Sequence, residues 1–377
     1  HTEKFLKIIA KNAQAQNVRV FFVGGAVRDN ILNIPIKDFD LIVQGNAIDF
    51  ASKISDEIKI KSKHPDFATV KVEYNNLIFD LASTRTETYP KSGCLPVVAE
   101  VGVAIEKDVF RRDFTINSLY SEILIENDEL NFKLIDLVDG VNDINKKKLK
   151  VLHKKSYIDD PTRILRGLEF KYRFKKKYNF DFSEDDINLI KEYLIKPNRT
   201  GLSFDRTFSV LKKMLNNDFC SEILEEFVQK KLYRIFLDEL SLDINLIKNI
   251  KKDFNLTSLE FADFIVLLIK NKVNNLTIEK KILNSNYEIY NAFKKLKNVD
   301  LVSYFYETKD NNALTFNKIK NIKILTKGSD LIKLGYQKGK ILSEILKALF
   351  EAKTSNALEF KNKQDEINFI LKNFPLS

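Results

Sequence analysis

An apolar run enters a pair of glycines near the start of the chain, and two aspartates on alternate residues follow. The two segments read Phe22-Val23-Gly24-Gly25 and Asp38-Phe39-Asp40. Glycine has no Cβ, so its backbone can turn sharply and approach a ligand closely. Residues two apart on a strand point to the same side, about 6.6 Å apart along the axis. The order therefore predicts a strand, a glycine turn, a short helix and a second strand that presents Asp38 and Asp40 to one small volume.

These parts together predict a phosphate cradle beside a divalent-metal site. A helix N-terminus that follows glycines favours an anion. Paired carboxylates supply the oxygen-only ligands that suit Mg²⁺, so Asp38 and Asp40 are the candidate metal ligands. The alternative is an ordinary turn followed by two solvated aspartates, and either element alone would favour it. Their combination favours the metal site.

Two further motifs narrow the interpretation. They are Arg111-Arg112-Asp113-Phe114-Thr115-Ile116-Asn117 and Asp159-Asp160-Pro161-Thr162-Arg163-Ile164-Leu165-Arg166. In this order, and with the Gly24-Gly25-Ala26-Val27-Arg28-Asp29 segment, they resemble class II tRNA nucleotidyltransferases, which belong to the superfamily that includes DNA polymerase beta. The resemblance is dense across residues 17–175 and loose to 230. Beyond that it is faint, apart from residues 328–335.

The resemblance implies an α+β fold with an N-terminal mixed α/β nucleotidyltransferase head and a small β-sheet, followed by a mostly α-helical neck, body and tail. We place the catalytic head at residues 1–140 and the helical neck, for base recognition and RNA binding, at 141–230. The helical body would span 231–300 and the tRNA-binding helical tail 301–377. The hydrophobic pattern agrees, because strand signals nearly vanish after Asp159 and helical spacing takes over.

Within the head, the residue pattern predicts several elements. Residues 68–74 and 77–83 form a hairpin across Asn75-Asn76, a favourable turn pair. Residues 84–106 contain both prolines of the region and Gly93, have no strong periodicity and are expected to form a long mobile loop. A helix is expected to begin in residues 113–119.

The implied reaction is the transfer of a nucleotide to an RNA 3′-hydroxyl with release of pyrophosphate, assisted by Mg²⁺. Asp38 and Asp40 would be catalytic metal ligands. Asp80, in Ile78-Phe79-Asp80-Leu81, occupies the place of the superfamily's third catalytic carboxylate. The alternative for Asp80 is an exposed residue at the end of a strand.

The nucleotide-binding residues that the resemblance implies in the first two motifs are Gly24, Gly25, Arg28, Arg112, Asp113 and Asn117. The guanidinium of Arg28 offers a fork of donors suited to the triphosphate, and Asp29 would orient it or cap the turn. Arg112 and Asp113 would contact the sugar and phosphates, with Asn117 in support. Asp113 fits equally well as a helix N-cap.

The third motif would read the incoming base. Asp160, Arg163 and Arg166 follow a helical spacing that places them on one stripe. A carboxylate beside a guanidinium offers an acceptor and donors to the edge of a base. The alternative for Asp160 is a helix N-cap with Pro161 at the first helical position.

One departure from the family pattern is visible after the third motif. The family usually continues Arg-Ala-x-Arg-Phe, whereas this chain reads Arg166-Gly167-Leu168-Glu169-Phe170. Glu169 reverses a charge that is expected near the nucleotide. This chain therefore has no cation at position 169 to make the contact that an arginine would make there.

The resemblance implies addition of C, C and then A to the 3′ end of tRNA, from CTP and ATP and without a nucleic-acid template. Relatives include enzymes that add only CC, enzymes that add only the final A, and poly(A) polymerases. Residues 84–106, with Arg85, Glu87, Tyr89 and Pro90, resemble a flexible element that CC-only members lack, which argues for addition of A. A-only and poly(A) addition are the alternatives, and a catalytically silent nucleotidyltransferase-like RNA-binding protein is the alternative of another class. A small-molecule nucleotidyltransferase would not need the long basic helical part.

Composition agrees with a nucleic-acid partner and a cytoplasmic location. The formal net charge of +10 favours a polyanion, although AT-biased coding would also enrich lysine. Two cysteines without CxxC spacing argue against a disulfide framework or a cysteine zinc site and suit a reducing cytoplasm. The most apolar run, residues 261–269, is short and broken by Asp263, so no membrane span is expected.

The basic clusters predict salt-dependent RNA binding. They lie mainly in the helical part, at residues 146–148, 154–155, 171–177 and 294–295. If these clusters contact phosphates along the RNA backbone, tRNA affinity should fall as salt rises. A plot of log affinity against log salt concentration should then have a slope of about −0.7 to −0.9 per phosphate contact. Filter binding across a range of KCl concentrations measures this slope. A flat response would leave the clusters as solvated helix faces.

Overall fold

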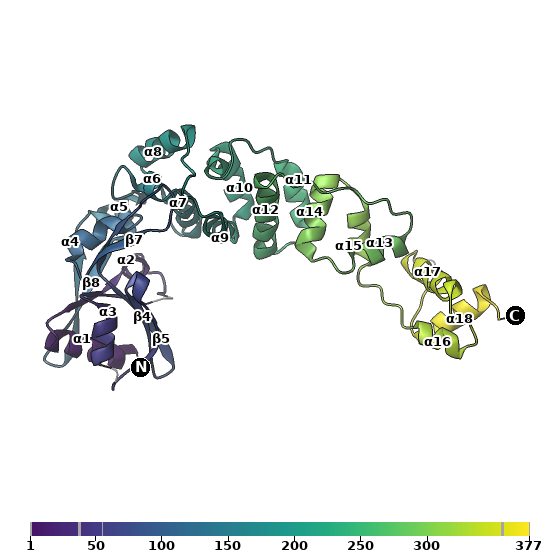
Figure 1. Ribbon diagram of the computed structural model, residues 1–377, viewed down its shortest axis with the longest axis horizontal. Helices are drawn as coiled ribbons and strands as arrows, with labels where there is room; N and C mark the ends of the chain where they lie inside the picture. Colours follow the sequence, from purple (N-terminus) through teal and green to yellow (C-terminus); the bar gives the residue numbers. More distant parts are fainter. Residues whose placement is uncertain (1, 37–38, 55, 356–357, 377) are drawn as a thin grey trace. The chain divides into compact units, whose positions relative to one another are not determined.

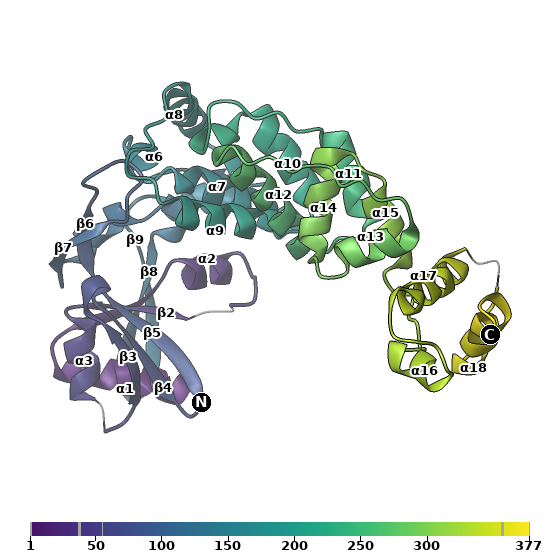
Figure 2. The same ribbon diagram turned by 45° about the vertical axis from the view of Figure 1, so that its right-hand side comes forward.

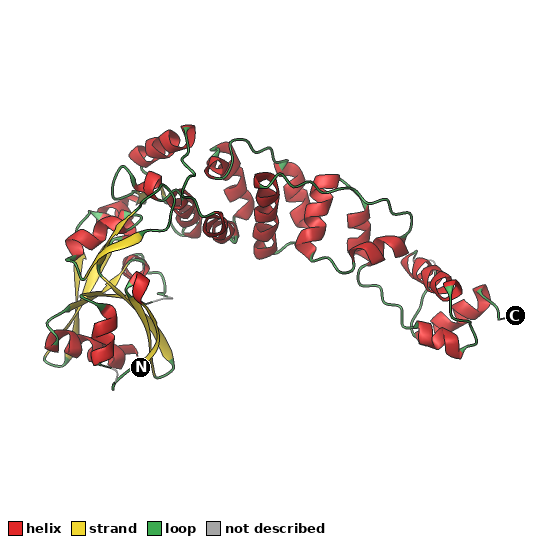
Figure 3. Ribbon diagram, in the orientation of Figure 1, coloured by secondary structure: helices red, strands yellow, loops and turns green. Residues whose placement is uncertain are grey.

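The computed structural model describes residues 2–36, 39–54, 56–355 and 358–376. The chain forms two compact units, His1–Glu239 and Leu240–Ser377 (Figure 1). Within the described ranges, strands lie in the first unit alone and the second is helical (Figure 3). The predicted α+β class, with a sheet-containing head followed by helices, is confirmed. The boundaries expected at residues 140, 230 and 300 stay predictions.

A seven-stranded sheet forms the centre of the first unit, in the order β3-β4-β5-β2-β1-β8-β9. The β2–β5 pair is parallel, and the other neighbours run antiparallel. The strands are β1 (Arg19–Val23), β2 (Asp40–Gln44), β3 (Lys59–His64), β4 (Thr69–Tyr74), β5 (Leu77–Ser83), β8 (Leu119–Glu126) and β9 (Glu129–Asp136).

The predicted hairpin across Asn75-Asn76 is confirmed. β4 and β5 pair from Tyr74↔Leu77 onward. Asn75 and Asn76 have φ angles of 47° and 65°. A tight hairpin turn of this kind requires positive φ at both central residues, and asparagine tolerates it better than most residue types.

Helices of the first unit flank the sheet and continue beyond it. They are α1 (Thr2–Ala15), α2 (Gly25–Ile31), α3 (Ala47–Lys53), α4 (Ile105–Asp108), α5 (Gly140–Lys146), α6 (Ser156–Asp159), α7 (Thr162–Arg173), α8 (Glu184–Ile195), α9 (Phe204–Leu215) and α10 (Cys220–Gln229). Short elements complete this unit: β10 (Lys148–Leu149), β11 (Asp181–Phe182) and the 3₁₀ turns η1 (Pro65–Phe67), η2 (Val109–Arg111), η3 (Thr115–Asn117) and η4 (Leu232–Ile235).

Alternation along β2 separates the two faces of the sheet. Leu41 and Val43 pack into the core beneath α1 and α3, which lie together in Figure 1. Ile42 belongs to a second cluster on the opposite face, together with Ile105 of α4. Because side chains alternate along a strand, Asp40 shares the face of Ile42.

The expected mobile loop at residues 84–106 is wrong. The segment folds into an antiparallel pair, β6 (Arg85–Thr88) and β7 (Val97–Val101), and then enters α4. These two strands pair only with each other and bury no complete face. They therefore lack the alternating apolar pattern by which a strand is recognised in a sequence.

The helix expected to begin in residues 113–119 is also wrong. This stretch contains only the 3₁₀ turn η3, and β8 begins at Leu119. The Asp113 side chain accepts hydrogen bonds from the backbone of Phe114 and from the side chain of Asn117. An aspartate that binds the backbone locally in this way favours a turn over a regular helix.

The second unit consists of α11 (Ile244–Asp253), α12 (Ser258–Val273), α13 (Asn286–Phe293), α14 (Asn298–Thr308), α15 (Asn312–Ile319), α16 (Gly328–Lys333), α17 (Lys340–Thr354) and α18 (Lys363–Asn373). The helical spacing found after Asp159 is thus confirmed. None of the helices in the described part of the chain combines the length and the hydropathy that a bilayer-spanning segment requires.

Helices α7 and α9 lie side by side in the first unit (Figure 2). Gly167 lies on α7, and the packing around it leaves no space for a side chain. A Cβ there would lie 2.4 Å from the ring of Phe182 and 3.0 Å from that of Phe114. Both rings are buried, so the space that a methyl group needs is already filled.

Gly167→Ala should therefore destabilise the first unit. Overpacking a core destabilises a protein by about 1–3 kcal/mol. Alanine is more favourable than glycine inside a helix by about 1 kcal/mol, which offsets part of that loss. We expect the free energy of unfolding to fall by about 1 kcal/mol, as measured by urea unfolding followed by circular dichroism. Gly328→Ala is the control, because no heavy atom lies within 4 Å of its added Cβ. A Gly167→Ala protein more stable than wild type would contradict the packing argument.

Candidate functional site

A cavity of about 410 Å³ in the first unit brings together residues from all three sequence motifs. The predicted site residues that line it are Gly24, Gly25, Arg28, Asp40, Arg112, Asp113, Asn117, Asp160, Arg163 and Arg166. Asp80 does not line it, and Asp38 lies outside the described residues.

The cavity carries an excess of positive charge. Its cationic side chains are Arg28, Arg111, Arg112, Arg163, Arg166, Arg173, Arg206 and Lys213. Its acidic side chains are Asp29, Asp40, Glu87, Asp113 and Asp160. Eight cations stand against five acids, and seven of the cations are arginines, whose fork of donors suits an anion with several phosphate oxygens.

Gly24 provides the turn between β1 and α2. Its φ of 68° lies in the left-handed region, where a side chain would be strained. The turn places Gly25 at the first position of α2, and the backbone N–H of Arg28 donates to the Gly24 carbonyl oxygen. The double glycine therefore shapes the wall of the cavity from which Arg28 projects.

Arg28 is 2% exposed and firmly held. Its Nε and Nη2 donate to one oxygen of Asp29, at 2.8 and 2.6 Å, and its Nη1 donates to the side-chain oxygen of Asn117. The guanidinium also lies 5.2 Å from the ring centre of Phe170 and 5.0 Å from that of Phe174. Burial lowers the pKa of Arg28, and Asp29 opposes that shift. Asp29 thus orients Arg28, as one of the two sequence interpretations expected.

Two carboxylates on neighbouring strands of the sheet form part of a candidate site for a divalent cation. Asp40 begins β2 and stands in direct parallel register with Asp80 on β5, so the two carboxylates share a face. Asp80 is also 3.5 Å from the ammonium of Lys71. Over the described ranges, which omit Asp38, no three His, Cys, Asp or Glu side chains gather as a metal site. The oxygen-only donors of Asp40 and Asp80 fit a hard cation.

Asp113 links the second motif to the third. One oxygen accepts from the Phe114 backbone N–H at 2.8 Å and from Asn117 at 3.1 Å, and the other lies 2.5 Å from Arg166. Burial alone would raise the pKa of Asp113, but the charge of Arg166 and these hydrogen bonds lower it. Asp113 is therefore an ionised carboxylate at neutral pH.

Asp160 is 3% exposed and lines the cavity, and its contacts agree with the helix-capping interpretation, whereas its role in reading the base stays a prediction. Its Oδ1 accepts from the Thr162 backbone N–H at 3.1 Å, which caps the start of α7. Arg206 of α9 donates from Nη1 to Oδ1 at 3.2 Å and from Nη2 to Oδ2 at 2.5 Å. Burial would raise the pKa of Asp160, but the hydrogen bonds and charge of Arg206 lower it.

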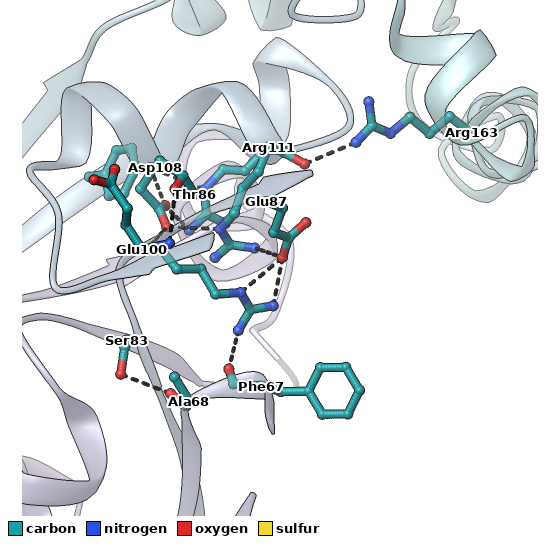
Figure 4. Close-up of polar contacts among 12 residues, drawn as sticks. Phe67, Ala68, Ser83, Thr86, Glu87, Glu100, Asp108, Arg111 and Arg163 are labelled. Atoms are coloured by element: carbon teal, nitrogen blue, oxygen red, sulfur yellow. Dashed lines mark hydrogen bonds and ion pairs between the residues drawn. The ribbon is translucent and has the colours of Figure 1, made fainter. Parts of the chain in front are cut away.

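Arg163 is also 3% exposed. Its Nη2 donates to the backbone oxygen of Arg111 at 2.9 Å, as Figure 4 shows, and to the hydroxyl of Tyr89 at 3.3 Å. Burial raises the pKa of Tyr89 to about 12, so its phenol stays neutral. Arg163 thus joins α7 to the β6–β7 hairpin.

The sequence interpretation missed several of these contacts. Arg206 is 46 residues from Asp160 in the chain, and no local pattern indicates the pair. Asp108, Arg111 and Arg112 have helical i, i+3 and i+4 spacing, which could have indicated a shared carboxylate. Glu169 does not line the cavity. The charge of Asp113 is the largest cause that raises the pKa of Arg166, and the charge of Glu169 adds to it.

The chain is similar to a known protein family and to several known proteins. Residues 20–150 match the family of the poly A polymerase head domain. A relative named A-adding tRNA nucleotidyltransferase, from Aquifex aeolicus, is 28% identical over 88% of this chain and 44% of its own length. A second protein of that name, from Halalkalibacterium halodurans, is 34% identical over 49% of this chain and 42% of its own length. The chain thus spans less than half the length of these two relatives.

A third relative and one solved structure are named CCA-adding enzymes instead. A CCA-adding enzyme from Staphylococcus epidermidis is 27% identical over 60% of this chain and 53% of its own length. The structure of a Thermotoga maritima CCA-adding enzyme complexed with tRNA aligns with a TM-score of 0.72. It covers 98% of this chain and 95% of that one at 22% identity, so this likeness concerns the fold alone.

Removal of the Arg206 fork should destabilise the first unit in a pH-dependent way. Arg206→Met leaves the buried Asp160 without its cation, which costs about 3 kcal/mol. Because the folded pKa of Asp160 is lowered, the pair stabilises the fold above the unfolded pKa of about 3.9. That contribution disappears as the pH falls through the lower folded pKa.

Urea unfolding at a series of pH values measures this difference between variant and wild type. Lys176→Met is the control, because Lys176 pairs with the exposed Asp218 and should have little effect. A difference for Arg206→Met that stays constant down to the lowest pH at which the protein folds would contradict the ionic origin.

Proposed function

We propose that this chain is a member of the class II tRNA nucleotidyltransferase family and that it adds nucleotides to the 3′ end of tRNA without a nucleic-acid template, with ATP as a substrate and Mg²⁺ as cofactor. One observation carries the proposal. Asp40 at the start of β2, the carboxylate of Asp160 and the guanidinium of Arg163 line the same cationic cavity.

The reacting end of the cavity lies at Asp40. In the proposed step the RNA 3′-hydroxyl oxygen forms a bond to the α-phosphorus, the hydroxyl loses its proton, and the bond to pyrophosphate breaks. Asp38 and Asp40 would hold the cation, with Asp80 on the neighbouring strand as a further carboxylate. When bound, Mg²⁺ would supply positive charge to the attacking and leaving oxygens.

The triphosphate and sugar would lie between the first two motifs. Arg28 and Arg112 project into the cavity as preformed donors, because buried or partly buried acceptors hold both guanidiniums. Donors that are fixed before the substrate arrives cost little reorganisation during the reaction. Asp113, ionised beside Arg166, can accept a hydrogen bond from a ribose hydroxyl.

Base selection would follow from the donor and acceptor order at Asp160 and Arg163. Cytosine and adenine each present an amino donor beside a ring-nitrogen acceptor, whereas guanine and uracil reverse that order. The Oδ2 of Asp160 accepts from Arg206 and retains acceptor capacity for an amino group. A guanidinium supplies five N–H donors, and Arg163 would offer one of them to the ring nitrogen. The pair therefore accepts C and A and opposes G and U.

Two versions of this function remain, and different observations favour each. Relatives named A-adding enzymes align at 28–35% identity, which favours addition of the terminal A alone. The pocket chemistry accepts C as well as A, which favours addition of the whole CCA. We propose addition of the terminal A as the activity that both versions share.

Transfer assays with three tRNA transcripts test the proposal. The transcripts end before CCA, after the first C and after CC, and each is incubated with CTP or ATP. Addition of one A to the CC transcript is the expected result. Elongation of the shorter transcripts by CTP would extend the function to CCA, and long A tails would indicate a poly(A) polymerase. Absence of transfer by a folded, tRNA-binding protein would support the RNA-binding alternative.

Asp40→Asn should abolish transfer while tRNA binding persists. The variant keeps the size of the side chain but loses a proposed metal-ligand charge, so we expect the rate to fall by about 10²–10³-fold or more. Quenched-flow transfer and filter binding measure the two properties. Asp66→Asn is the control, since Asp66 is exposed in η1 and does not line the cavity. Transfer by Asp40→Asn at the wild-type rate would contradict the assignment.

A further inference from the structure

A fully buried carboxylate lies behind the cavity without lining it. Asp108, the last residue of α4, is 0% exposed. Its Oδ1 accepts from the Arg85 backbone N–H at 2.9 Å and from Arg111 Nε at 2.8 Å. Its Oδ2 accepts from Arg112 Nη2 at 2.9 Å and from the Tyr120 hydroxyl at 2.8 Å. Four donors occupy the acceptor capacity of one carboxylate, so Asp108 itself has no capacity for a ligand.

The side chains that Asp108 holds do reach the cavity. Arg112, which lines it, donates from Nε to the Tyr120 hydroxyl at 3.1 Å and lies 5.2 Å from the Tyr120 ring centre. Asp108 and Tyr120 therefore fix the guanidinium from two sides. Burial raises the pKa of Tyr120, so its hydroxyl keeps the proton that it donates to Asp108.

Asp108 also anchors Arg111, which links two further parts of the site. Figure 4 shows Arg111 between Asp108 and Glu87, 3.5 Å from the Glu87 carboxylate. The backbone oxygen of Arg111 accepts the 2.9 Å hydrogen bond from Arg163. The chain of contacts thus runs from the buried carboxylate to the guanidinium proposed to read the base.

The two neighbouring arginines, Arg111 and Arg112, favour the charged form of Asp108. Arg111 and Arg112 are adjacent and partly buried, so the guanidiniums repel each other; burial and Arg112 both lower the pKa of Arg111. Burial would raise the pKa of Asp108, but Arg112 and Arg111 lower it. A neutral residue at position 108 would leave the two guanidiniums unbalanced, and water would compete for them.

We propose that Asp108 is a positioning residue for the nucleotide: it holds Arg112 in place for the phosphates and sugar and, through Arg111, fixes the carbonyl against which Arg163 is set. The inference rests on the proposed function and assigns to Asp108 an effect on nucleotide affinity and base choice. It acts through Arg112 and Arg111 and does not touch the substrate.

Asp108→Asn tests the inference beside a matched control. Asp186 is 1% exposed and likewise accepts from a tyrosine hydroxyl, that of Tyr157, and from a backbone N–H, that of Val151. It does not line the cavity and holds no arginine that does. Tyr120→Phe and Tyr157→Phe form a second matched pair, which removes one hydroxyl from each carboxylate.

Two readouts separate positioning from a merely structural role. ATP binding in the absence of RNA, measured by calorimetry, should weaken at least tenfold in Asp108→Asn and severalfold in Tyr120→Phe. The two controls should stay within twofold of wild type. In transfer assays the KM for ATP should rise while the KM for tRNA stays unchanged, and misincorporation of GTP and UTP relative to ATP should increase.

The outcomes are distinct. Equal ATP affinity and equal misincorporation in Asp108→Asn and Asp186→Asn would overturn the positioning role. If circular dichroism shows Asp108→Asn to be unfolded, Tyr120→Phe decides, and an affinity equal to that of Tyr157→Phe would overturn it. A wild-type protein that binds ATP but transfers no nucleotide would refute the proposed function, whereas the binding comparison would still test Asp108.

Discussion

The cavity exists because buried carboxylates balance its arginines. A guanidinium removed from water is costly unless an acceptor is at hand. The structure supplies a carboxylate for most of these arginines: Asp29 for Arg28, Asp113 for Arg166, Asp160 for Arg206, and Asp108 for Arg111 and Arg112. Arg163 instead donates to a backbone oxygen and a tyrosine hydroxyl. Each of these acids is at most 7% exposed. The pairing holds several cations close together around one space, which their mutual repulsion would otherwise prevent. The positive field that suits a triphosphate therefore depends on acids that the triphosphate would not touch.

The same pairing preorganises the chemistry. Donors with fixed partners need little reorientation when charge develops on phosphate oxygens, and a base can be read only by side chains whose directions are set. Asp160 has such fixed partners, because its Oδ1 accepts from the first turn of α7 and Arg206 donates to both of its oxygens. Arg163 depends in turn on the carbonyl of Arg111. In the proposed function, base choice and phosphate binding would thus be coupled through the backbone between the second motif and α4.

Much of the fold and site could be predicted from local pattern. The double glycine, the Asn75-Asn76 turn and the helical spacing after Asp159 depend on near neighbours, and the structure has the turns and helices that they predict. The β6–β7 hairpin was missed because it buries no face, and the helix expected after Asp113 gave way to a side-chain-stabilised turn. Arg206 and Asp108 act through partners chosen by tertiary packing, which no spacing along the chain specifies fully. The catalytic and nucleotide-binding roles of all the site residues, Asp38 and Asp80 among them, stay predictions.

The central claim is that side chains of one cavity, without a nucleic-acid template, select the incoming base. The most direct measurement is kcat/KM for ATP, GTP and UTP, each offered alone with a tRNA transcript that ends in CC. The account predicts that ATP is preferred over both by about tenfold to several hundredfold, because well-paired contacts discriminate by about 1–3 kcal/mol each. Comparable kcat/KM values for the three nucleotides would contradict it.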